Sequence, residues 1–224
     1  LLSNIMLNEL DKELERRGLP FVRYADDSMI FCKSKRAAMR VKESITRFIE
    51  NTLYLKVNKE KTVVSYVRGV KYLGYSFYVM KGKCQLTVHP KSKAKMKSRL
   101  KELTSRSNGW GYAKRKQKLK EYIRGWVGYY HLANMKRLLL ETDEWLRRRI
   151  RMCIWKAWKK PKTKVANLIK CGINKYQAYE WGNTRKGYWR IADSHILHKA
   201  ITNEHLCRAG YAALMDAYLE WYPK

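Results

Sequence analysis

The amino-acid sequence predicts an α+β protein in which a mixed part with helices and a β-sheet is followed by a helical part. Over residues 1–85, helical periodicity alternates with short runs of β-forming side chains. Strand signals stop after Pro90, where helical spacing takes over. The charge balance changes as well, because residues 1–60 hold 12 basic and 9 acidic side chains whereas residues 61–224 hold 37 and 10. Helices covering one face of a mainly antiparallel sheet would account for the first part.

Two amphipathic helices are predicted in the first part, over residues 2–17 and 35–50. In the first, apolar side chains recur on one side at helical spacing: Leu2, Ile5, Met6, Leu10 and Leu14. Gly18 and Pro20 follow it, and both residue types end helices. The second shows the same spacing and therefore the same kind of buried face.

Between these helices, two β-forming runs flank a pair of aspartates. The runs are residues 21–25 and 28–31, and the pair is Asp26-Asp27, so the pattern predicts a hairpin with both carboxylates at its tip. Residues 56–66 and 70–80 are also predicted as strands, the second ending at a turn over residues 81–83.

The second part is predicted to be a bundle with one cationic flank. Three basic helices are expected over residues 91–106, 114–131 and 141–158, with apolar faces inward. A linker is expected around Pro161. Beyond it we expect a short helix near residues 163–170 and an irregular aromatic and basic stretch ending at residues 185–190. Two last helices are expected after that stretch. Asp193 or Ser194 would cap the first, and Asn203 would cap the second, whose inner face extends from Leu206 to Trp221.

The charge indicates the class of partner. The formal net charge is +30, and two stretches, between Glu60 and Glu102 and between Glu144 and Glu180, each hold eleven basic residues and no carboxylate. The basic side chains of these stretches repel one another, which favours a bound polyanion. Nucleic acid is therefore preferred as the partner over an acidic membrane surface, and a bound partner over a solvated lysine face. No apolar run approaches the ~20 residues of a spanning helix.

The cysteines and histidines predict neither disulfides nor a zinc site. Five cysteines without a close pair are typical of reduced thiols. The densest group of possible metal ligands is His195, His198, His205 and Cys207, for which packing roles are favoured over metal binding.

Asp26 and Asp27 are the strongest candidates for chemistry. Adjacent carboxylates repel each other, and strands are depleted in Asp, so a cation should neutralise them. Mg²⁺ is the natural candidate, because proteins hold it by one or two carboxylates together with substrate phosphates. The alternative is that Asp26-Asp27 is a plain turn dipeptide.

The residues that flank Asp26 and Asp27 favour metal binding over a plain turn, because they resemble a known sequence signature. Residues 21–27, Phe-Val-Arg-Tyr-Ala-Asp-Asp, resemble the YADD signature of reverse transcriptases encoded by group II introns. Further stretches resemble that family in the same order: the helix of residues 1–11, Asn-Lys-Glu-Lys-Thr at 58–62, Tyr-Leu-Gly-Tyr-Ser-Phe at 72–77, Gly-Trp-Val-Gly-Tyr-Tyr at 125–130, and Arg-Lys-Gly-Tyr-Trp-Arg at 185–190.

The resemblance implies three regions. Residues 1–85 would be the C-terminal part of a polymerase palm, residues 86–160 an α-helical thumb also called domain X, and residues 161–224 a small helical DNA-binding region without a nuclease. In the palm, Asp26 and Asp27 would be catalytic metal ligands for Mg²⁺ and Lys61 an acid or phosphate contact. The residues implied at the primer end are Tyr24, Ala25, Tyr72, Leu73, Gly74 and Tyr75.

Nucleic acid would be bound by basic residues of the last two regions, mainly through phosphates. The expected residues are Lys91, Lys93, Lys95, Lys97, Arg99, Lys114, Lys118, Arg124, Arg147, Arg148, Arg151, Lys159, Lys160, Arg185, Lys186 and Arg190.

The family's two-metal site needs a further aspartate from an upstream strand, which these 224 residues do not contain. We therefore expect that this chain alone binds RNA but does not polymerise. The complete protein would be an RNA-directed DNA polymerase and splicing maturase supporting retrohoming, in the bacterial cytoplasm rather than an organelle. Its expected partners are group II intron RNA, an RNA template with a DNA primer, a DNA target and dNTP, with no membrane and a possible homodimer. The alternatives are a maturase without polymerase activity and a reverse transcriptase of a host-defence system.

Overall fold

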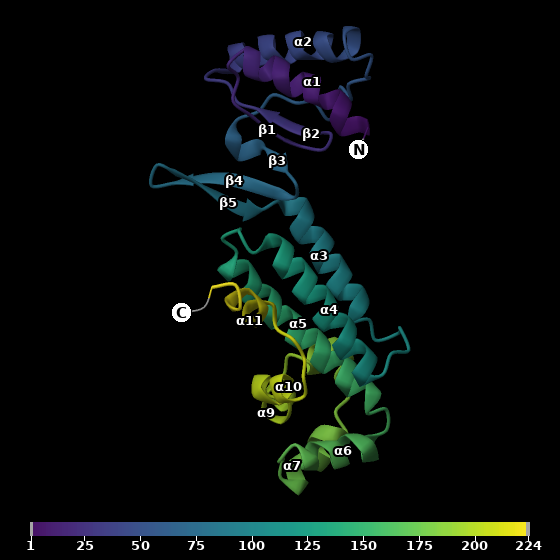
Figure 1. Cartoon of the computed structure of the whole chain (residues 1–224). Coiled ribbons are helices and arrows are strands. Elements are labelled where there is room, and N and C mark those ends of the chain that lie inside the picture. The colour runs from purple at the N-terminus through teal and green to yellow at the C-terminus, as the bar shows by residue number, and fades with distance from the viewer. Residues whose placement is uncertain (1, 223–224) are drawn as a thin grey trace. The chain divides into compact units, whose positions relative to one another are not determined.

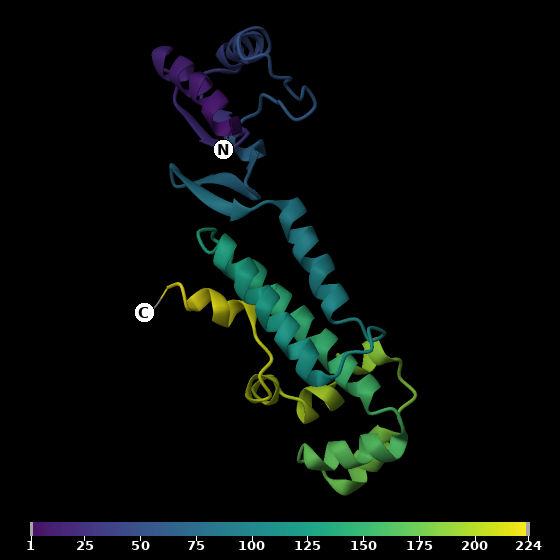
Figure 2. The same ribbon diagram turned by 45° about the vertical axis from the view of Figure 1, so that its right-hand side comes forward.

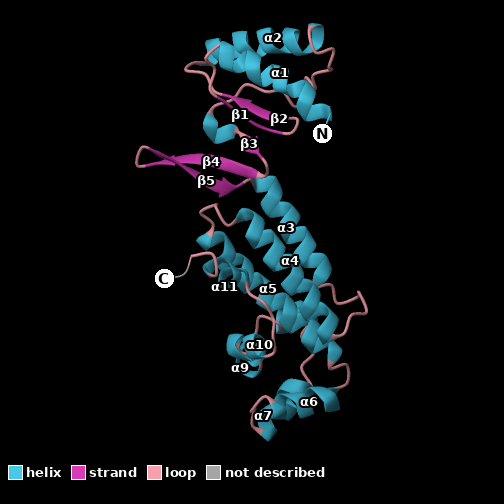
Figure 3. Ribbon diagram, viewed as in Figure 1, coloured by secondary structure: helices cyan, strands magenta, loops and turns pink. Residues whose placement is uncertain are grey.

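The computed structural model describes residues 2–222 and divides into two compact units, residues 1–87 and 88–224. Among the described residues, the strands lie in the first unit, the last of them ending at Val88 on the border, and the second unit is helical (Figure 3). The α+β class is confirmed. No helix in the described part of the chain combines the length and the apolar character that a membrane crossing requires.

The first unit begins with two helices packed on a hairpin (Figure 1). Helix α1 (Leu2–Arg16) is followed by strands β1 (Phe21–Tyr24) and β2 (Asp27–Ile30), and then by α2 (Lys35–Asn51). Their apolar faces form one core, whose buried members are Leu10, Leu14, Ile45 and Leu53. The helices predicted over residues 2–17 and 35–50 are therefore confirmed.

Local signals end α1 and begin α2. Gly18 has a φ of +65°, and the N–H groups of Gly18 and Leu19 donate to the carbonyls of Glu15 and Leu14, which closes α1. Ser34 caps α2 by accepting a hydrogen bond from the Ala37 N–H.

The rest of the first unit departs from the prediction. Residues 56–66 form no strand, because Asn58 organises a turn in which its carbonyl accepts from Thr62 N and its side chain accepts from Lys61 N. A short 3-10 helix (Val67–Gly69) follows. The strand predicted over residues 70–80 is divided into β3 (Lys71–Tyr72) and β4 (Tyr75–Met80) by a turn at Leu73-Gly74.

Two sheets replace the single sheet that was expected. Strands β1 and β2 form one, and β3, β4 and β5 (Lys83–Val88) form the other in that order. The turn predicted at residues 81–83 is present, with positive φ at Lys81 and Gly82. Short strands separated by tight turns explain the division, because each hairpin pairs only with its sequence neighbour.

The second unit contains the predicted bundle. Helices α3 (Pro90–Leu103), α4 (Tyr112–Tyr130) and α5 (Lys136–Ala157) overlap the three basic segments, although α5 begins five residues before its predicted start. Helix α3 packs on both α4 and α5. Their buried faces follow helical spacing, as in Leu119, Ile123 and Val127 of α4. Figure 2 shows α3, α4 and α5 running along one another.

The region after α5 is more helical than expected. Helix α6 (Pro161–Lys170) starts at the residue assigned to a linker, since Pro occupies its first position without needing an N–H partner. Helices α7 (Lys175–Gly182) and α8 (Tyr188–Ile191) lie in the stretch expected to be irregular. The helix α9 (His195–Ala200) follows Ser194, as expected.

The last predicted helix is broken into two. Helix α10 (Asn203–Arg208) ends before Gly210, whose φ of +83° stops it, and α11 (Leu214–Leu219) then packs on α4 and α5. The chain therefore returns to the bundle at its end. Asp143 of α5 accepts hydrogen bonds from the N–H groups of Leu214 and Met215, at 2.8 and 2.9 Å, and so caps α11.

The close approach of α6 and α7 gives a testable prediction. A Cβ added at Gly182 would lie 2.6 Å from Val165 Cγ2 and 3.3 Å from Val165 N, so Gly182→Ala should lower the free energy of unfolding by about 1–3 kcal/mol. In the double variant Gly182→Ala, Val165→Ala, the loss of unfolding free energy should be about 1 kcal/mol smaller than the sum of the losses in the two single variants. Gly125→Ala in α4 is the control, because its Cβ meets nothing within 4 Å. Urea denaturation followed by circular dichroism measures all four variants, and equal losses at Gly125 and Gly182 would contradict the packing argument.

Candidate nucleic-acid interface and acidic hairpin

The acidic hairpin is shifted by one residue from its predicted form. Tyr24 pairs with Asp27 in the β1–β2 register, so Ala25 and Asp26 make the turn and Asp27 is the first residue of β2. The prediction that both aspartates occupy the break is therefore wrong by one position. Ala25 has a φ of +54°, a left-handed conformation that a side chain rarely adopts. Both aspartates are exposed.

Arg23 holds this turn in place. Its Nε donates to Asp11 Oδ1 at 2.7 Å, and Nη2 forms an ion pair with Asp11 Oδ2. Nη1 donates to the Ala25 carbonyl at 2.9 Å and to Asn4 Oδ1 at 3.1 Å. The ion pair with Asp11 raises the pKa of Arg23, which therefore remains charged. One side chain thus joins α1 to the strained residue beside the aspartates, and this compensates for the strain.

The predicted primer-end residues lie on two hairpins. Tyr24 and Ala25 belong to the acidic hairpin, whereas Tyr72 pairs with Tyr75 across the Leu73-Gly74 turn, where both central φ angles are positive. The Tyr72 hydroxyl is buried and has no hydrogen-bond partner in the part of the chain that the structure describes. Burial raises the pKa of Tyr72, with a further contribution from the negative charge of Asp27. Tyr72 and the acidic hairpin are therefore electrostatic neighbours.

Lys61 lies in the turn begun by Asn58 and is exposed. This turn is attached to α2, because Lys42 Nζ donates to the Thr62 carbonyl at 2.5 Å. A hollow of about 400 Å³ lies beside this attachment, lined by Lys42, Glu43, Thr46, Arg47, Val57, Lys59 and Thr62. The structure thus gives Lys61 a fixed backbone and an unburied side chain, and its catalytic role remains a prediction.

Most of the predicted nucleic-acid contacts lie exposed or half-buried on the helical unit. On α3 and α4 they alternate with the buried face, and two of them are paired at the surface, Arg99 with Glu102 and Lys118 with Glu121. Two others lie over aromatic rings, Lys97 over Trp145 and Lys114 over Trp110. Surface pairs of this kind cost little to exchange for a phosphate.

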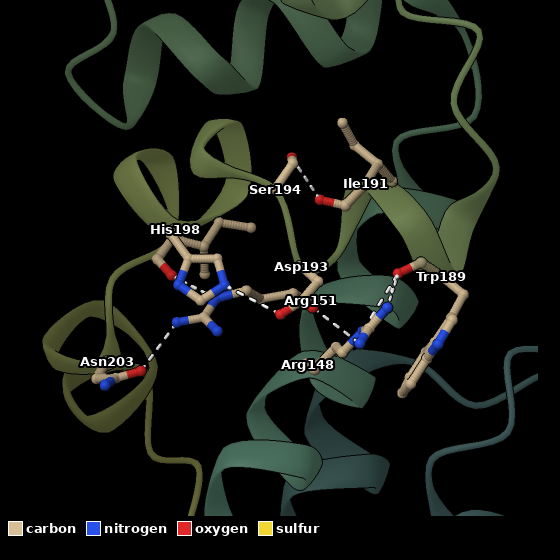
Figure 4. Close-up of polar contacts among 9 residues, drawn as sticks. Arg148, Arg151, Trp189, Ile191, Asp193, Ser194, His198 and Asn203 are labelled. Atoms are coloured by element: carbon tan, nitrogen blue, oxygen red, sulfur yellow. Dashed lines mark hydrogen bonds and ion pairs between the residues drawn. The ribbon is translucent and has the colours of Figure 1, made fainter.

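The structure removes Arg151 from this set. Its side chain is 3% exposed, Nε donates to the Ile201 carbonyl at 2.8 Å, and Nη2 donates to Asn203 Oδ1 at 2.9 Å (Figure 4). Burial lowers the pKa of Arg151. Arg151 joins α5 to the start of α10 and cannot reach a phosphate while it does so. This structural role of Arg151 could not be predicted from the sequence, because Arg151 lies on a helix with several other arginines.

Arg148 has partners within the protein as well. It lies between α8 and the loop that follows, where Nη1 pairs with Asp193 Oδ2 at 2.8 Å and Nη2 donates to the Trp189 carbonyl at 3.1 Å (Figure 4). Its guanidinium also stacks on the Trp189 indole at 3.9 Å from the ring centroid. Arg148 was predicted from the sequence only as a phosphate contact, and its partners in α8 and the following loop carry no signal at helical spacing.

Sequence reasoning missed three other polar residues of this unit. Arg149 donates to Thr104, Arg115 is buried beside Asn108, and Asp143 caps α11. Their partners lie far along the chain or in loops, so helical spacing carries no signal for them. Within residues 2–222 no three histidine, cysteine or acidic side chains, those of His195, His198, His205 and Cys207 included, are grouped so that they could hold a metal ion.

Comparison with known proteins identifies both units. Residues 1–77 match the family described as reverse transcriptase (RNA-dependent DNA polymerase), and residues 93–172 match the group II intron, maturase-specific domain. The two matches support a group II intron reverse transcriptase and maturase. A search of the curated proteins found no match. The reverse transcriptase match precedes the maturase-specific match along the chain, which is the order predicted from the motifs at residues 21–27 and 125–130.

Reverse transcriptases generally use Mg²⁺, so the acidic hairpin can be compared with what that ion needs. Asp26 and Asp27 supply exposed carboxylate oxygens, which are the donors Mg²⁺ prefers. Within the described residues no third acidic, histidine or cysteine ligand joins them. The donors of this reverse transcriptase chain therefore fit the ion in kind but not in number.

Proposed function

We propose that this chain binds group II intron RNA through the cationic surface of its helical unit, and that it assists splicing. In the complete protein, the acidic hairpin would contribute to an RNA-directed DNA polymerase that copies an RNA template from a DNA primer during retrohoming. The same proposal includes a DNA target, dNTP and the bacterial cytoplasm as its setting, and a homodimer as a possible form.

One observation carries the proposal: the basic side chains of α3 and α4 other than Arg115 are exposed or half-buried, whereas the apolar faces of the two helices are buried. Lys91, Lys95 and Arg124 are exposed, and none of them forms an ion pair with a described carboxylate. Cations held on rigid helices repel one another until a polyanion neutralises them. A duplex or folded RNA offers phosphates at the matching density, and phosphate contact requires no particular base.

A maturase without polymerase activity is the second candidate. The maturase-specific match supports binding and splicing by itself. Against it, Ala25 keeps a strained φ and Arg23 keeps four polar contacts around two repelling aspartates. A pure RNA-binding protein has no physical need for that arrangement, so we favour retained polymerase chemistry in the complete protein. The maturase-type bundle likewise disfavours a host-defence role.

Salt titration of RNA binding tests the proposal. With six to ten phosphate contacts, affinity for structured intron RNA should fall roughly 10³-fold to 10⁵-fold between about 50 mM and about 200 mM salt. The variant Lys91→Gln, Lys95→Gln, Arg124→Gln should reduce the slope of log affinity against log salt by about 2–3.

A matched control removes three charges from α2, with Arg36→Gln, Arg40→Gln and Arg47→Gln. This control should keep the wild-type slope to within about 1, because α2 lies outside the proposed surface. A flat salt dependence of the wild-type chain, or equal losses in the two triple variants, would refute the proposed surface.

A further inference from the structure

The segment between α7 and α9 presents two aromatic rings with an arginine over each. Trp189 has the Arg148 guanidinium 3.9 Å from its ring centroid, and Tyr188 has the Arg106 guanidinium 5.1 Å from its own. Both arginines come from the bundle, Arg148 from α5 and Arg106 from the loop after α3. Neighbouring residues of one short helix are thus held by two separate parts of the same unit.

Hydrogen bonds hold the Arg148 side chain and the backbone of Arg106. Arg148 donates to the Trp189 carbonyl and pairs with Asp193, as Figure 4 shows. The loop that carries Arg106 is tied to α5, because Lys156 Nζ donates to the Arg106 carbonyl at 2.6 Å. A ring supported in this way loses little conformational freedom when a ligand stacks on it.

The rings are nevertheless accessible. Tyr188 is 38% exposed and Trp189 is 40% exposed, although large aromatic side chains in a helical domain usually serve its core. Around them the charge is strongly positive, since residues 159–190 hold nine lysines and arginines and one carboxylate, Glu180. Arg185, Lys186 and Arg190 adjoin the rings in sequence and are all exposed.

We propose that Tyr188 and Trp189 form a stacking platform for unpaired nucleotides of a single-stranded nucleic acid. The bases stack on the ring faces, and the neighbouring cations neutralise the backbone. The arginine on each ring adds positive charge to the stack and fixes the ring orientation. Duplex offers no free base faces, so the platform distinguishes single strands from the double-stranded regions bound by α3 and α4. This inference rests on the proposed nucleic-acid function and deepens it.

The test compares fluorescein-labelled 12-nucleotide probes by fluorescence anisotropy. The probes are single-stranded DNA, single-stranded RNA, an abasic strand with the same phosphates, and a duplex. Trp189→Leu and Tyr188→Leu should each weaken single-strand binding about 5-fold to 150-fold. Binding of the abasic strand and of the duplex should change by no more than about twofold, because their contacts are to phosphates. The DNA and RNA arms show which sugar the site accepts.

Two further variants separate stacking from folding. Trp189→Phe keeps an aromatic face and should retain most of the single-strand affinity. Tyr176→Leu is the matched control, because Tyr176 is 80% exposed on α7 and has no cation over its ring in the described structure. Thermal melting verifies that each variant is folded, and the abasic comparison on the wild-type chain needs no variant at all.

The platform is refuted if the wild-type chain binds the abasic and natural strands equally, or if Tyr176→Leu costs as much as Trp189→Leu. Either result leaves the proposed function standing as long as structured intron RNA still binds with its salt dependence. Loss of intron RNA binding by the wild-type chain refutes the proposed function instead.

Discussion

The 224-residue chain, given a primed RNA template, dNTP and Mg²⁺, is expected to show no primer extension. Two-metal phosphoryl transfer depends on ions that clamp both the attacking and the leaving oxygen. Asp26 and Asp27 supply two carboxylates, and no third ligand of the kind approaches them within residues 2–222. Without positioning of the ions and the nucleotide, most of the rate enhancement of such enzymes is lost.

Gel analysis of extended primers measures this result. Wild-type chain and Asp26→Ala should be indistinguishable from a reaction without protein, while a complete reverse transcriptase in the same buffer extends the primer. RNA binding by both proteins should be equal, because Asp26 lies outside the cationic helical unit. Robust Mg²⁺-dependent extension that Asp26→Ala abolishes would overturn the expectation and show that the 224 residues form an active site.

Replacing Asp143 by alanine should destabilise the helical unit by about 2–4 kcal/mol at neutral pH. The carboxylate is 2% exposed and accepts the N–H groups of Leu214 and Met215 at the start of α11. Its removal leaves both donors without a partner in a mostly buried position. It also releases α11 from α4 and α5, where the Tyr218 hydroxyl donates to the Ala133 carbonyl.

The effect should depend on pH with a definite sign. Burial raises the pKa of Asp143 above its ordinary value of 3.8, against the lowering effect of the two backbone N–H groups. A raised carboxyl pKa means that the folded state binds the proton more tightly than the unfolded state. The contribution of this titration is therefore complete below pH 3.8 and is lost as the pH rises through the raised value. The difference in unfolding free energy between the wild type and Asp143→Ala should therefore decrease as the pH rises through the pKa of the folded state.

Chemical denaturation at several pH values measures both effects. Asp216→Ala is the control, because Asp216 is exposed in the first turn of α11 and should matter by less than about 0.5 kcal/mol. If Asp143→Ala and Asp216→Ala were equally stable, the cap would contribute nothing. A difference that grows with pH would show that the pKa is lowered rather than raised.

The elements with strong periodicity could be predicted, and those made by local turns could not. Helices α1, α2, α4 and α5 repeat apolar residues at helical spacing and lie close to their predicted bounds. Residues 56–66 contain β-forming side chains at strand spacing, yet the Asn58 turn prevails because its hydrogen bonds close within five residues. Gly210 likewise divides the last helix, since a φ of +83° is incompatible with helix continuation.

The candidate site divides in a similar way. The aspartate pair and the cationic character of the helical unit are visible in the residues alone, because local charge and a short motif need no tertiary contact to be recognised. The sequence does not show which of the arginines is available to bind a phosphate. Arg147, Arg148 and Arg151 are nearly identical in sequence context, but Arg151 is buried against Ile201 and Asn203 while Arg148 stacks on Trp189.

The sequence by itself thus determined the α+β class, the family and the likeness of the chain to a polyanion-binding protein. Only the tertiary structure decided that Asp143 caps a helix some seventy residues away, that Ala25 rather than Asp27 lies in the hairpin turn, and that two arginines support the rings of Tyr188 and Trp189. The physical reason is that periodicity and charge are properties of neighbouring residues. Burial and hydrogen-bond pairing instead depend on partners that folding brings together from distant parts of the chain.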